Sequence, residues 1–181
     1  MTTNNQKLIN RAKAIRLLLL DVDGVLTDGR LYYGNNDEEL KAFNIQDGLG
    51  IKLLQRNNIQ VGIITGRTSE LVARRASELG IELIVQGRED KLTALQETLK
   101  GMDKESQLQM EQIAFLGDDL PDVAVIRRVG LGVAVANARE FVADNAHWQT
   151  TAKGGYGAVR ELAEMILQAQ DKLDSTLSNY L

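Results

Sequence analysis

The feature that most constrains the fold of this chain is a regular alternation of short apolar runs with longer amphipathic stretches. The runs are rich in Ile, Leu and Val, which is typical of strands that are covered on both faces. The stretches between them have the pattern of helices that bury one side. We expect strands at residues 16–20, 60–65, 82–85, 112–116 and 131–135, and helices near 48–57, 69–79, 89–100, 121–128, 138–144 and 157–172.

Right-handed crossovers between such strands predict a doubly wound, Rossmann-like α/β fold, with a parallel sheet flanked by helices and no cap domain. One domain accounts for residues 1–181, because domains commonly hold about 100–200 residues. Residues 148–151 are a candidate edge strand. Gly80 and Gly130 stand where helix ends favour a left-handed residue, and the polar tail at 171–181 is expected to be flexible.

One segment interrupts the alternation directly after the first strand. Residues 30–33 and 38–43 have strand character, and the turn residues 34–37 lie between them. The segment predicts a small β-hairpin flap at about 29–45. Ligands bind near this position in open α/β sheets, so both a flap that covers the substrate and a purely structural arm stay open as interpretations.

The formal net charge of −4 argues against a general nucleic-acid binder, since such proteins carry a basic surface that replaces phosphate counterions. A local group of basic residues, among them Arg67, Arg75 and Lys91, suits a small anionic ligand better. The absence of cysteine excludes disulfides and thiolate metal sites. Because no apolar leader and no membrane-spanning run is found, we expect a cytoplasmic protein with no membrane partner.

Polar side chains follow four of the expected strands. The carboxyl ends of parallel strands meet at one edge of a sheet, where ligands collect, so these side chains can share a site although they are far apart in the sequence. They are Asp21 and Asp23 after the first strand, Thr65, Gly66 and Arg67 after the second, Lys91 after the third, and Asp118, Asp119 and Asp122 after the fourth.

Each of these groups alone is common turn or surface chemistry, and only their joint placement indicates a site. Carboxylates that face one small volume repel each other by about 4 kcal/mol per pair, at a separation of about 4 Å and an effective dielectric constant of about 20. A bound cation offsets this repulsion. Oxygen ligands with no His or Cys nearby favour Mg²⁺ over zinc, so the pattern predicts a magnesium site.

The segments around these residues resemble the motifs of the haloacid dehalogenase-type phosphatases. The segment at 21–27 (DVDGVLT) resembles the first motif, Thr65 the second, Lys91 the third, and the segment at 117–122 (GDDLPD) the fourth. The motifs agree in their order and in their position at the ends of strands. They cover about residues 15–125, and the strand pattern extends the resemblance to the rest of the chain.

The resemblance implies that Asp21 attacks phosphorus to form an aspartyl-phosphate, and that Asp23 protonates the leaving group and later activates water. It implies Mg²⁺, with Mn²⁺ or Co²⁺ as substitutes, at this centre. The implied metal ligands are the side chains of Asp21 and Asp118 and the backbone carbonyl of Asp23, and the implied phosphoryl-oxygen contacts are Thr65 and Lys91. Either Asp119 or Asp122 orients Lys91 or metal-bound water, and the resemblance leaves this choice open.

Cap domains of this superfamily are inserted between the first and second motifs and between the third and fourth. Here neither interval holds more than the hairpin, so the resemblance is to the cap-less branch. Lids exclude water from active sites, and a site without a cap needs another cover. Cap-less relatives with such a hairpin form ring-like tetramers, so the resemblance implies a homotetramer in which each site is covered by a neighbouring protomer.

Within that branch the chain resembles the phosphatases that act on 3-deoxy-D-manno-octulosonate 8-phosphate in lipopolysaccharide synthesis. The matching segments are 21–29, 43–48, 64–67, 86–87 and 154–161. The resemblance implies a small phosphorylated sugar acid as the substrate, with one phosphate and one carboxylate. The residues implied to contact it are Asp23, Asn44, Ile45, Gln46, Asp47, Gly48, Gly66, Arg67, Arg75 and Lys91.

Two alternatives stay open at this point. A phosphatase for a nine-carbon, sialic-type sugar acid would use the same chemistry on another substrate. A non-catalytic phospho-receiver or scaffold module would also use an Asp pair, a Thr and a Lys on such a sheet. In receivers, however, the paired acids come first and the phosphorylated Asp stands alone, whereas here Asp23 adds an acid and base that a signalling domain lacks. The order of the residues therefore favours an enzyme.

Overall fold

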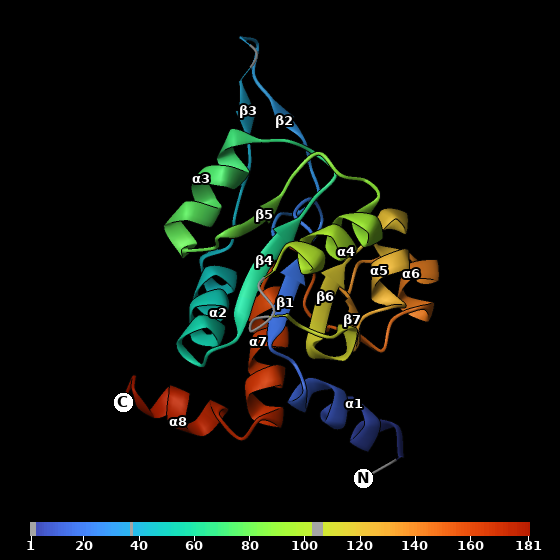
Figure 1. Cartoon of the computed structure of the whole chain (residues 1–181). Coiled ribbons are helices and arrows are strands. Elements are labelled where there is room, and N and C mark those ends of the chain that lie inside the picture. Colours follow the sequence, from blue (N-terminus) through green and yellow to red (C-terminus); the bar gives the residue numbers. More distant parts are fainter. Residues whose placement is uncertain (1–2, 37, 103–106) are drawn as a thin grey trace.

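The computed structural model describes residues 3–36, 38–102 and 107–181, and within these ranges six strands form one sheet in which all neighbours are parallel (Figure 1). Their order across the sheet is β5 (Leu83–Val85), β4 (Gln60–Ile64), β1 (Leu17–Leu20), β6 (Ile113–Gly117), β7 (Leu131–Ala134) and β8 (Trp148–Gln149). The five expected strands and the edge strand are confirmed, with ends that differ by one or two residues.

All four leucines of β1 are buried, because successive side chains point to opposite faces of the sheet and helices cover both faces. One core includes Leu18 and Leu20 and lies against α1 (Thr3–Lys13), α2 (Ile45–Arg56), α3 (Glu70–Leu79) and α7 (Ala158–Ala169). The other includes Leu17 and Leu19 and lies against α4 (Lys91–Gly101), α5 (Val123–Ile126) and α6 (Glu140–Asp144). The doubly wound α/β fold is therefore confirmed.

Several helical elements differ from the prediction. The helix expected from residue 48 begins at Ile45, because the side chain of Asn44 caps it by accepting a hydrogen bond from the Gln46 N–H. The helix expected at 121–128 is divided into a 3₁₀ turn, η2 (Leu120–Asp122), followed by α5. Helix α1, a 3₁₀ turn η1 (Met110–Gln112) and α8 (Leu173–Ser178) were not predicted. Flexibility of the tail stays a prediction.

The two glycines expected to end helices behave differently. Gly80 closes α3 in the left-handed region, with φ of 66°. The expectation for Gly130 is wrong, since its φ is not positive. A Cβ at Gly130 would lie 2.1 Å from the carbonyl oxygen of Glu111, so this glycine permits a close approach of two backbone segments.

The expected hairpin is confirmed and extends beyond the carboxyl ends of the sheet strands (Figure 1). Its strands are β2 (Tyr32–Tyr33) and β3 (Glu39–Leu40), which pair antiparallel. Asp37, which was expected in the turn, lies outside the described residues. Within the described ranges no cap domain is inserted beside this hairpin, and no helix in them is both long and apolar enough to cross a bilayer.

The direction of chain connection reverses between β1 and β6. From β1 the chain continues outward to β4 and β5, and from β6 it continues to β7 and β8 on the other side. Leu20 pairs with Ile63 on one side and with Leu116 on the other. Residues that follow these strands therefore emerge side by side at the switch point, where open α/β sheets bind ligands.

Candidate active site

A cavity of about 290 Å³ opens at this switch point. It is lined by Asp21, Asp23, Gly29, Thr65, Gly66, Arg67, Glu89, Lys91, Asp118, Asp119, Pro121 and Asp122. Every residue expected to be catalytic, metal-binding or supporting is among them. A larger cavity, of about 610 Å³, lies elsewhere, and its lining, which includes Leu17, Val61 and Met102, holds a single carboxylate, that of Glu82. Its chemistry does not match a phosphate site, so we place the active site in the smaller cavity.

Lys91 is almost fully buried and contacts two carboxylates in this cavity. It is the first residue of α4, and its Nζ lies 2.8 Å from Asp21 Oδ1 and 2.6 Å from Asp122 Oδ1. Burial lowers the pKa of Lys91, but the charges of Asp21 and Asp122 outweigh this effect and leave the pKa above its ordinary value. The ammonium group therefore stays charged and is fixed beside the Asp21 carboxylate.

Asp122 is the carboxylate that orients Lys91. Its second oxygen, Oδ2, accepts hydrogen bonds from the N–H groups of Asp118 at 2.9 Å and Asp119 at 3.3 Å. The side chain of Asp119 instead accepts from the Leu120 N–H at 2.8 Å and caps η2. Of the two candidates from the sequence, Asp122 makes the contact with Lys91, and both of its oxygens are already engaged by protein groups.

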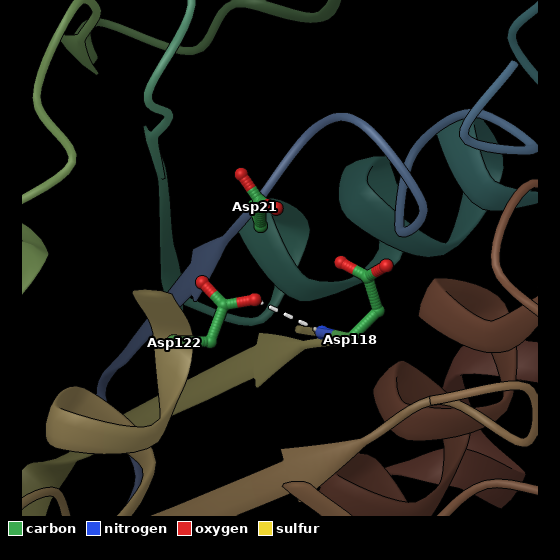
Figure 2. Close-up of side chains that lie close together, drawn as sticks. All are labelled: Asp21, Asp118 and Asp122. Carbon is green, nitrogen blue, oxygen red and sulfur yellow. Dashed lines mark hydrogen bonds between the residues drawn. The ribbon is translucent and has the colours of Figure 1, made fainter. Parts of the chain in front are cut away.

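Three carboxylates from two strand ends meet at one point (Figure 2). One oxygen each of Asp21, Asp118 and Asp122 lies within 4.8 Å of the others. Burial, with repulsion from Asp122 and partial compensation by Lys91, raises the pKa of Asp21 to about 6. Burial, with repulsion mainly from Asp21 and then Asp122, raises the pKa of Asp118 to about 7. The cluster therefore carries more negative charge than its surroundings stabilise.

These carboxylates fit a divalent cation. Asp118 Oδ1 is buried and has no hydrogen-bond partner among the described residues, an arrangement that costs free energy unless a bound group contacts it. Since Asp122 is engaged by Lys91 and backbone N–H groups, Asp21 and Asp118 are the side chains that can hold the ion. All available donors are oxygens, which suits a hard cation.

The loop after β1 has a shape that only glycine permits at Gly24. This residue has φ of 97°, and a Cβ there would lie 2.1 Å from Asp118 Oδ2. Thr27 closes the same loop by donating to the Val22 carbonyl at 3.3 Å and by accepting from the Gly29 N–H at 3.2 Å. The glycine in the first motif therefore lets the backbone beside Asp23 approach the carboxylate of Asp118.

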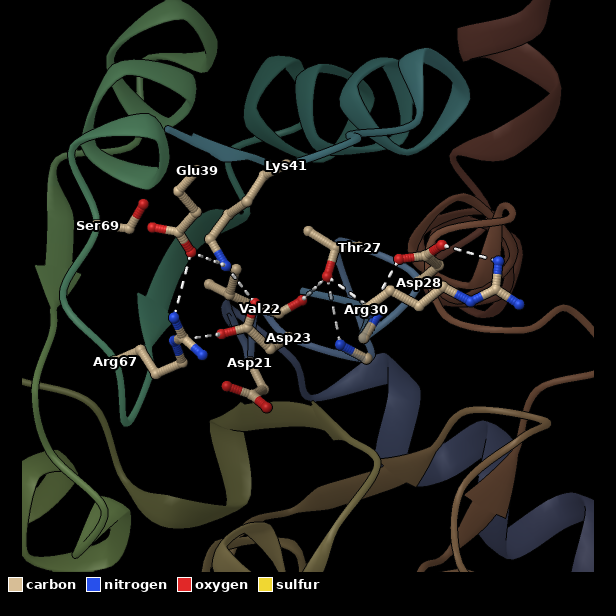
Figure 3. A network of polar contacts seen from close by, with 12 residues as sticks. Asp21, Val22, Asp23, Thr27, Asp28, Arg30, Glu39, Lys41, Arg67 and Ser69 are labelled. Atoms are coloured by element: carbon tan, nitrogen blue, oxygen red, sulfur yellow. Dashed lines mark hydrogen bonds and ion pairs between the residues drawn. The ribbon is translucent and has the colours of Figure 1, made fainter. Parts of the chain in front are cut away.

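Asp23 lies in a network of charged side chains that joins the hairpin to the cavity (Figure 3). Lys41 donates to Asp23 Oδ1 and lies 3.6 Å from Glu39 Oε1. Glu39 Oε1 also accepts from Arg67 at 3.2 Å, and Arg67 Nε lies 4.0 Å from Asp23 Oδ2. The sequence analysis missed Lys41 and Glu39, because nothing in their local pattern distinguishes them from solvated hairpin charges.

Six residues that were expected to contact the substrate are not among those that line this cavity. Asn44 caps α2 and donates to the Gly155 carbonyl at 3.2 Å. Asp47 accepts from the N–H groups of Gly157 at 3.2 Å and Arg160 at 3.0 Å. Arg75 pairs with Glu78 on α3 at 3.2 Å. The six, Asn44, Ile45, Gln46, Asp47, Gly48 and Arg75, therefore lie apart from Asp21, Thr65 and Lys91.

Comparison with known proteins shows which family this chain resembles. A family model described as haloacid dehalogenase-like hydrolase matches residues 83–162. The 3-deoxy-D-manno-octulosonate 8-phosphate phosphatase KdsC of Yersinia pestis is 52% identical over 166 residues, which cover 92% of this chain and 87% of that protein. The chain belongs to the haloacid dehalogenase-like hydrolases. Within this family it is a phosphatase.

Two solved structures of haloacid dehalogenase-like phosphatases bear on the metal. The 3-deoxy-D-manno-octulosonate 8-phosphate phosphatase of Moraxella catarrhalis, solved with magnesium, phosphate and KDO, is 42% identical, with a TM-score of 0.93 and coverage of 99% of this chain and 100% of that one. The cobalt-bound phosphatase of Haemophilus influenzae is 40% identical, with a TM-score of 0.84 and coverage of 90% and 93%. Together with the cluster of Asp21 and Asp118, they support a divalent-metal site here.

Proposed function

We propose that this phosphatase hydrolyses 3-deoxy-D-manno-octulosonate 8-phosphate to the free sugar acid and phosphate, as a step of lipopolysaccharide synthesis. The observation that carries the chemistry is the contact of Lys91 with Asp21, beside a buried oxygen of Asp118 that has no hydrogen-bond partner in the described part of the chain. The choice of substrate rests on the relatives, which are named for this reaction. We place the reaction in the cytoplasm, with no nucleic acid or membrane as a partner.

Asp21 is the nucleophile in this proposal. Lys91 contacts Asp21 Oδ1, and we assign the attack on phosphorus to the other oxygen, Oδ2. A bond forms between the Asp21 carboxylate and phosphorus while the bond from phosphorus to the sugar oxygen breaks, and Asp23 gives its proton to that oxygen. Asp23 then takes a proton from water, which attacks phosphorus, releases phosphate and restores Asp21. Splitting the hydrolysis in this way replaces one difficult step by two easier ones.

The proposed metal is Mg²⁺, which the side chains of Asp21 and Asp118 and the backbone carbonyl of Asp23 would hold, with Mn²⁺ or Co²⁺ as substitutes. When bound, it offsets the carboxylate charges and neutralises charge that develops on the phosphoryl group. Thr65 and Lys91 would hold the other phosphoryl oxygens. Gly66 and Arg67 also line the cavity, and Arg67 offers a guanidinium for the substrate carboxylate.

A homotetramer is part of the proposal. The hairpin exposes large apolar side chains, with Tyr33 68% and Leu40 66% exposed, and Ile45 at the start of α2 is 81% exposed. Such side chains are typical of a surface that another protein covers. In a ring of protomers, the contacts proposed for residues outside the cavity would come from a neighbouring chain. Ile45 and Gln46 are exposed and Asn44 and Arg75 are half-buried, so these four can face a neighbour, whereas Asp47 and Gly48 are buried in their own chain.

Phosphate release from a panel of substrates tests the function. We expect the highest kcat/KM on 3-deoxy-D-manno-octulosonate 8-phosphate, and loss of activity with chelator that added Mg²⁺ restores. A higher value on a nine-carbon sialic-type sugar-acid phosphate would select that substrate instead, and a preference for a neutral hexose phosphate would contradict both. Asp21→Asn should abolish turnover in a folded protein, while Asp174→Asn, on α8, is the matched control. A stable phosphoprotein without turnover would favour the receiver module.

A further inference from the structure

We infer that Lys41 is a positioning residue for Asp23, an inference that rests on the proposed function. Lys41 lies between β3 and α2, and only 2% of its side chain is exposed. Its ammonium donates to Asp23 Oδ1 and has Glu39, at 3.6 Å, as a second carboxylate neighbour. A lysine of the hairpin thus reaches directly to the side chain that gives and takes protons.

The burial of this lysine needs an explanation, because lysine side chains are seldom buried unless they are paired. The hairpin that carries it is small, with two residues in each strand, and its outer side chains are exposed. Packing of the hairpin alone therefore does not account for a buried ammonium group. Asp23 and Glu39 provide its counter-charges, and of these two only Asp23 belongs to the first motif.

The network also distinguishes the two oxygens of Asp23. Lys41 occupies Oδ1, while Oδ2 faces Arg67 Nε at the longer distance of 4.0 Å. Glu39 lies between Lys41 and Arg67 and separates the two cations. Fixing Oδ1 stops rotation of the carboxyl group and leaves Oδ2 for the proton that passes to the leaving oxygen. Lys41 itself need not touch the substrate.

This role predicts an effect that depends on the leaving group. An alkyl alkoxide leaves with the proton from Asp23, whereas a nitrophenolate is stable enough to leave without one. Because general acid catalysis contributes about 10²–10⁴-fold, misplacing Asp23 should slow alkyl phosphates far more than aryl phosphates. The value of kcat/KM reports only the steps through formation of the aspartyl-phosphate, so the later use of Asp23 as a base does not enter the comparison.

The test compares kcat/KM for 3-deoxy-D-manno-octulosonate 8-phosphate and p-nitrophenyl phosphate, with Mg²⁺ present, in wild type, Lys41→Met and Lys52→Met. Lys52 is the matched control, since its partly buried ammonium donates to the Leu79 carbonyl at 2.6 Å, away from the cavity. We expect the ratio of kcat/KM for the alkyl phosphate to kcat/KM for the aryl phosphate to fall by about tenfold or more in Lys41→Met. The same ratio should stay at the wild-type value in Lys52→Met. Lys41→Arg, which keeps a cation, should restore part of the ratio.

An equal loss on both substrates in Lys41→Met, or no loss, would overturn the inference and leave the proposed function intact. If wild type hydrolyses neither compound, the proposed function itself fails. Thermal unfolding shows whether each variant folds. If Lys41→Met does not, the same ratio is measured in Lys41→Gln, which keeps a polar group at this position, and an unchanged ratio there would equally overturn the role.

Discussion

Lys91 donates to Asp122 across a distance of 2.6 Å, although the two residues follow strands that lie on opposite sides of β1. Their contact links α4, which follows β5, to η2, which follows β6. Asp122 also accepts from the Asp118 N–H, so one carboxylate fixes both the lysine beside Asp21, the proposed nucleophile, and the backbone of Asp118, a proposed metal ligand. The geometry of the site therefore depends on a buried charge network as well as on the strand ends.

Removal of Lys91 tests this network. Lys91→Met would leave Asp21 and Asp122 buried without their cation, and loss of one partner of a buried ion pair costs about 3–5 kcal/mol. We expect the free energy of unfolding, measured with denaturant and without metal, to fall by this amount. The double variant Lys91→Met with Asp122→Asn should lose less free energy of unfolding than the sum of the losses in the two single variants. Strict additivity would show that the two side chains do not stabilise each other.

The raised pKa values of Asp21 and Asp118 predict how the metal-free protein responds to pH. The folded chain keeps these protons up to about pH 6 and 7, whereas an unfolded carboxyl loses its proton near 3.8. Between these values the folded chain holds more protons than the unfolded chain. The stability that the two protonated carboxyls contribute is therefore present at low pH and is lost as the pH rises through the folded pKa values. We expect the Tm in chelator to fall by about 5–10 °C between about pH 5 and pH 8.

Mg²⁺ and Asp118→Asn serve as controls for this pH dependence. Bound metal replaces the protons, so saturating Mg²⁺ should raise the Tm more at pH 8 than at pH 5. Asp118→Asn should flatten the metal-free profile and remove the effect of Mg²⁺. The lowered pKa of His147, caused by burial and then by Arg11, acts in the opposite direction and is common to both proteins. Equal slopes of the metal-free Tm against pH in wild type and Asp118→Asn would contradict the assignment of this pH dependence to Asp118.

The motif residues could be predicted because they depend only on where strands end. Asp21, Thr65 and Asp118 each follow a buried strand, and a parallel sheet brings such positions together whatever the details of packing. Lys41 and Glu39 reach the site from the arm of the hairpin that leads back to α2, and two-residue strands leave no periodic pattern that reveals this contact.

The substrate contacts were harder to predict from the sequence. The resemblance implied that residues 44–48, which follow the hairpin, contact the substrate. The side chains of Asn44 and Asp47 instead make hydrogen bonds to backbone groups at the ends of helices. A helix N-terminus attracts the same polar residue types as a binding loop, so composition alone does not separate the two roles.

Asp47 gives a test of which role applies. Its oxygens accept from the Gly157 and Arg160 N–H groups at the start of α7, and Asp47→Ala would leave these donors without partners. We expect a loss of about 2 kcal/mol in the free energy of unfolding. The exposed neighbour Gln46 is the control, and Gln46→Ala should leave stability unchanged. A large rise in KM with unchanged stability in Asp47→Ala would favour the substrate contact instead.

The proposed tetramer is tested at the tip of the hairpin. Tyr33 and Leu40 lie on neighbouring strands and expose most of their surface, so Tyr33→Glu with Leu40→Glu places charges where an apolar contact is proposed. We expect sedimentation to change from tetramer to smaller species, and kcat/KM to fall because the site loses its cover. Charges at Leu177 and Leu181, which are exposed near the C-terminal end of the chain, provide the control and should leave both measurements unchanged. A wild-type monomer with full activity would contradict the covered site, whereas a dissociated but active double variant would separate assembly from catalysis.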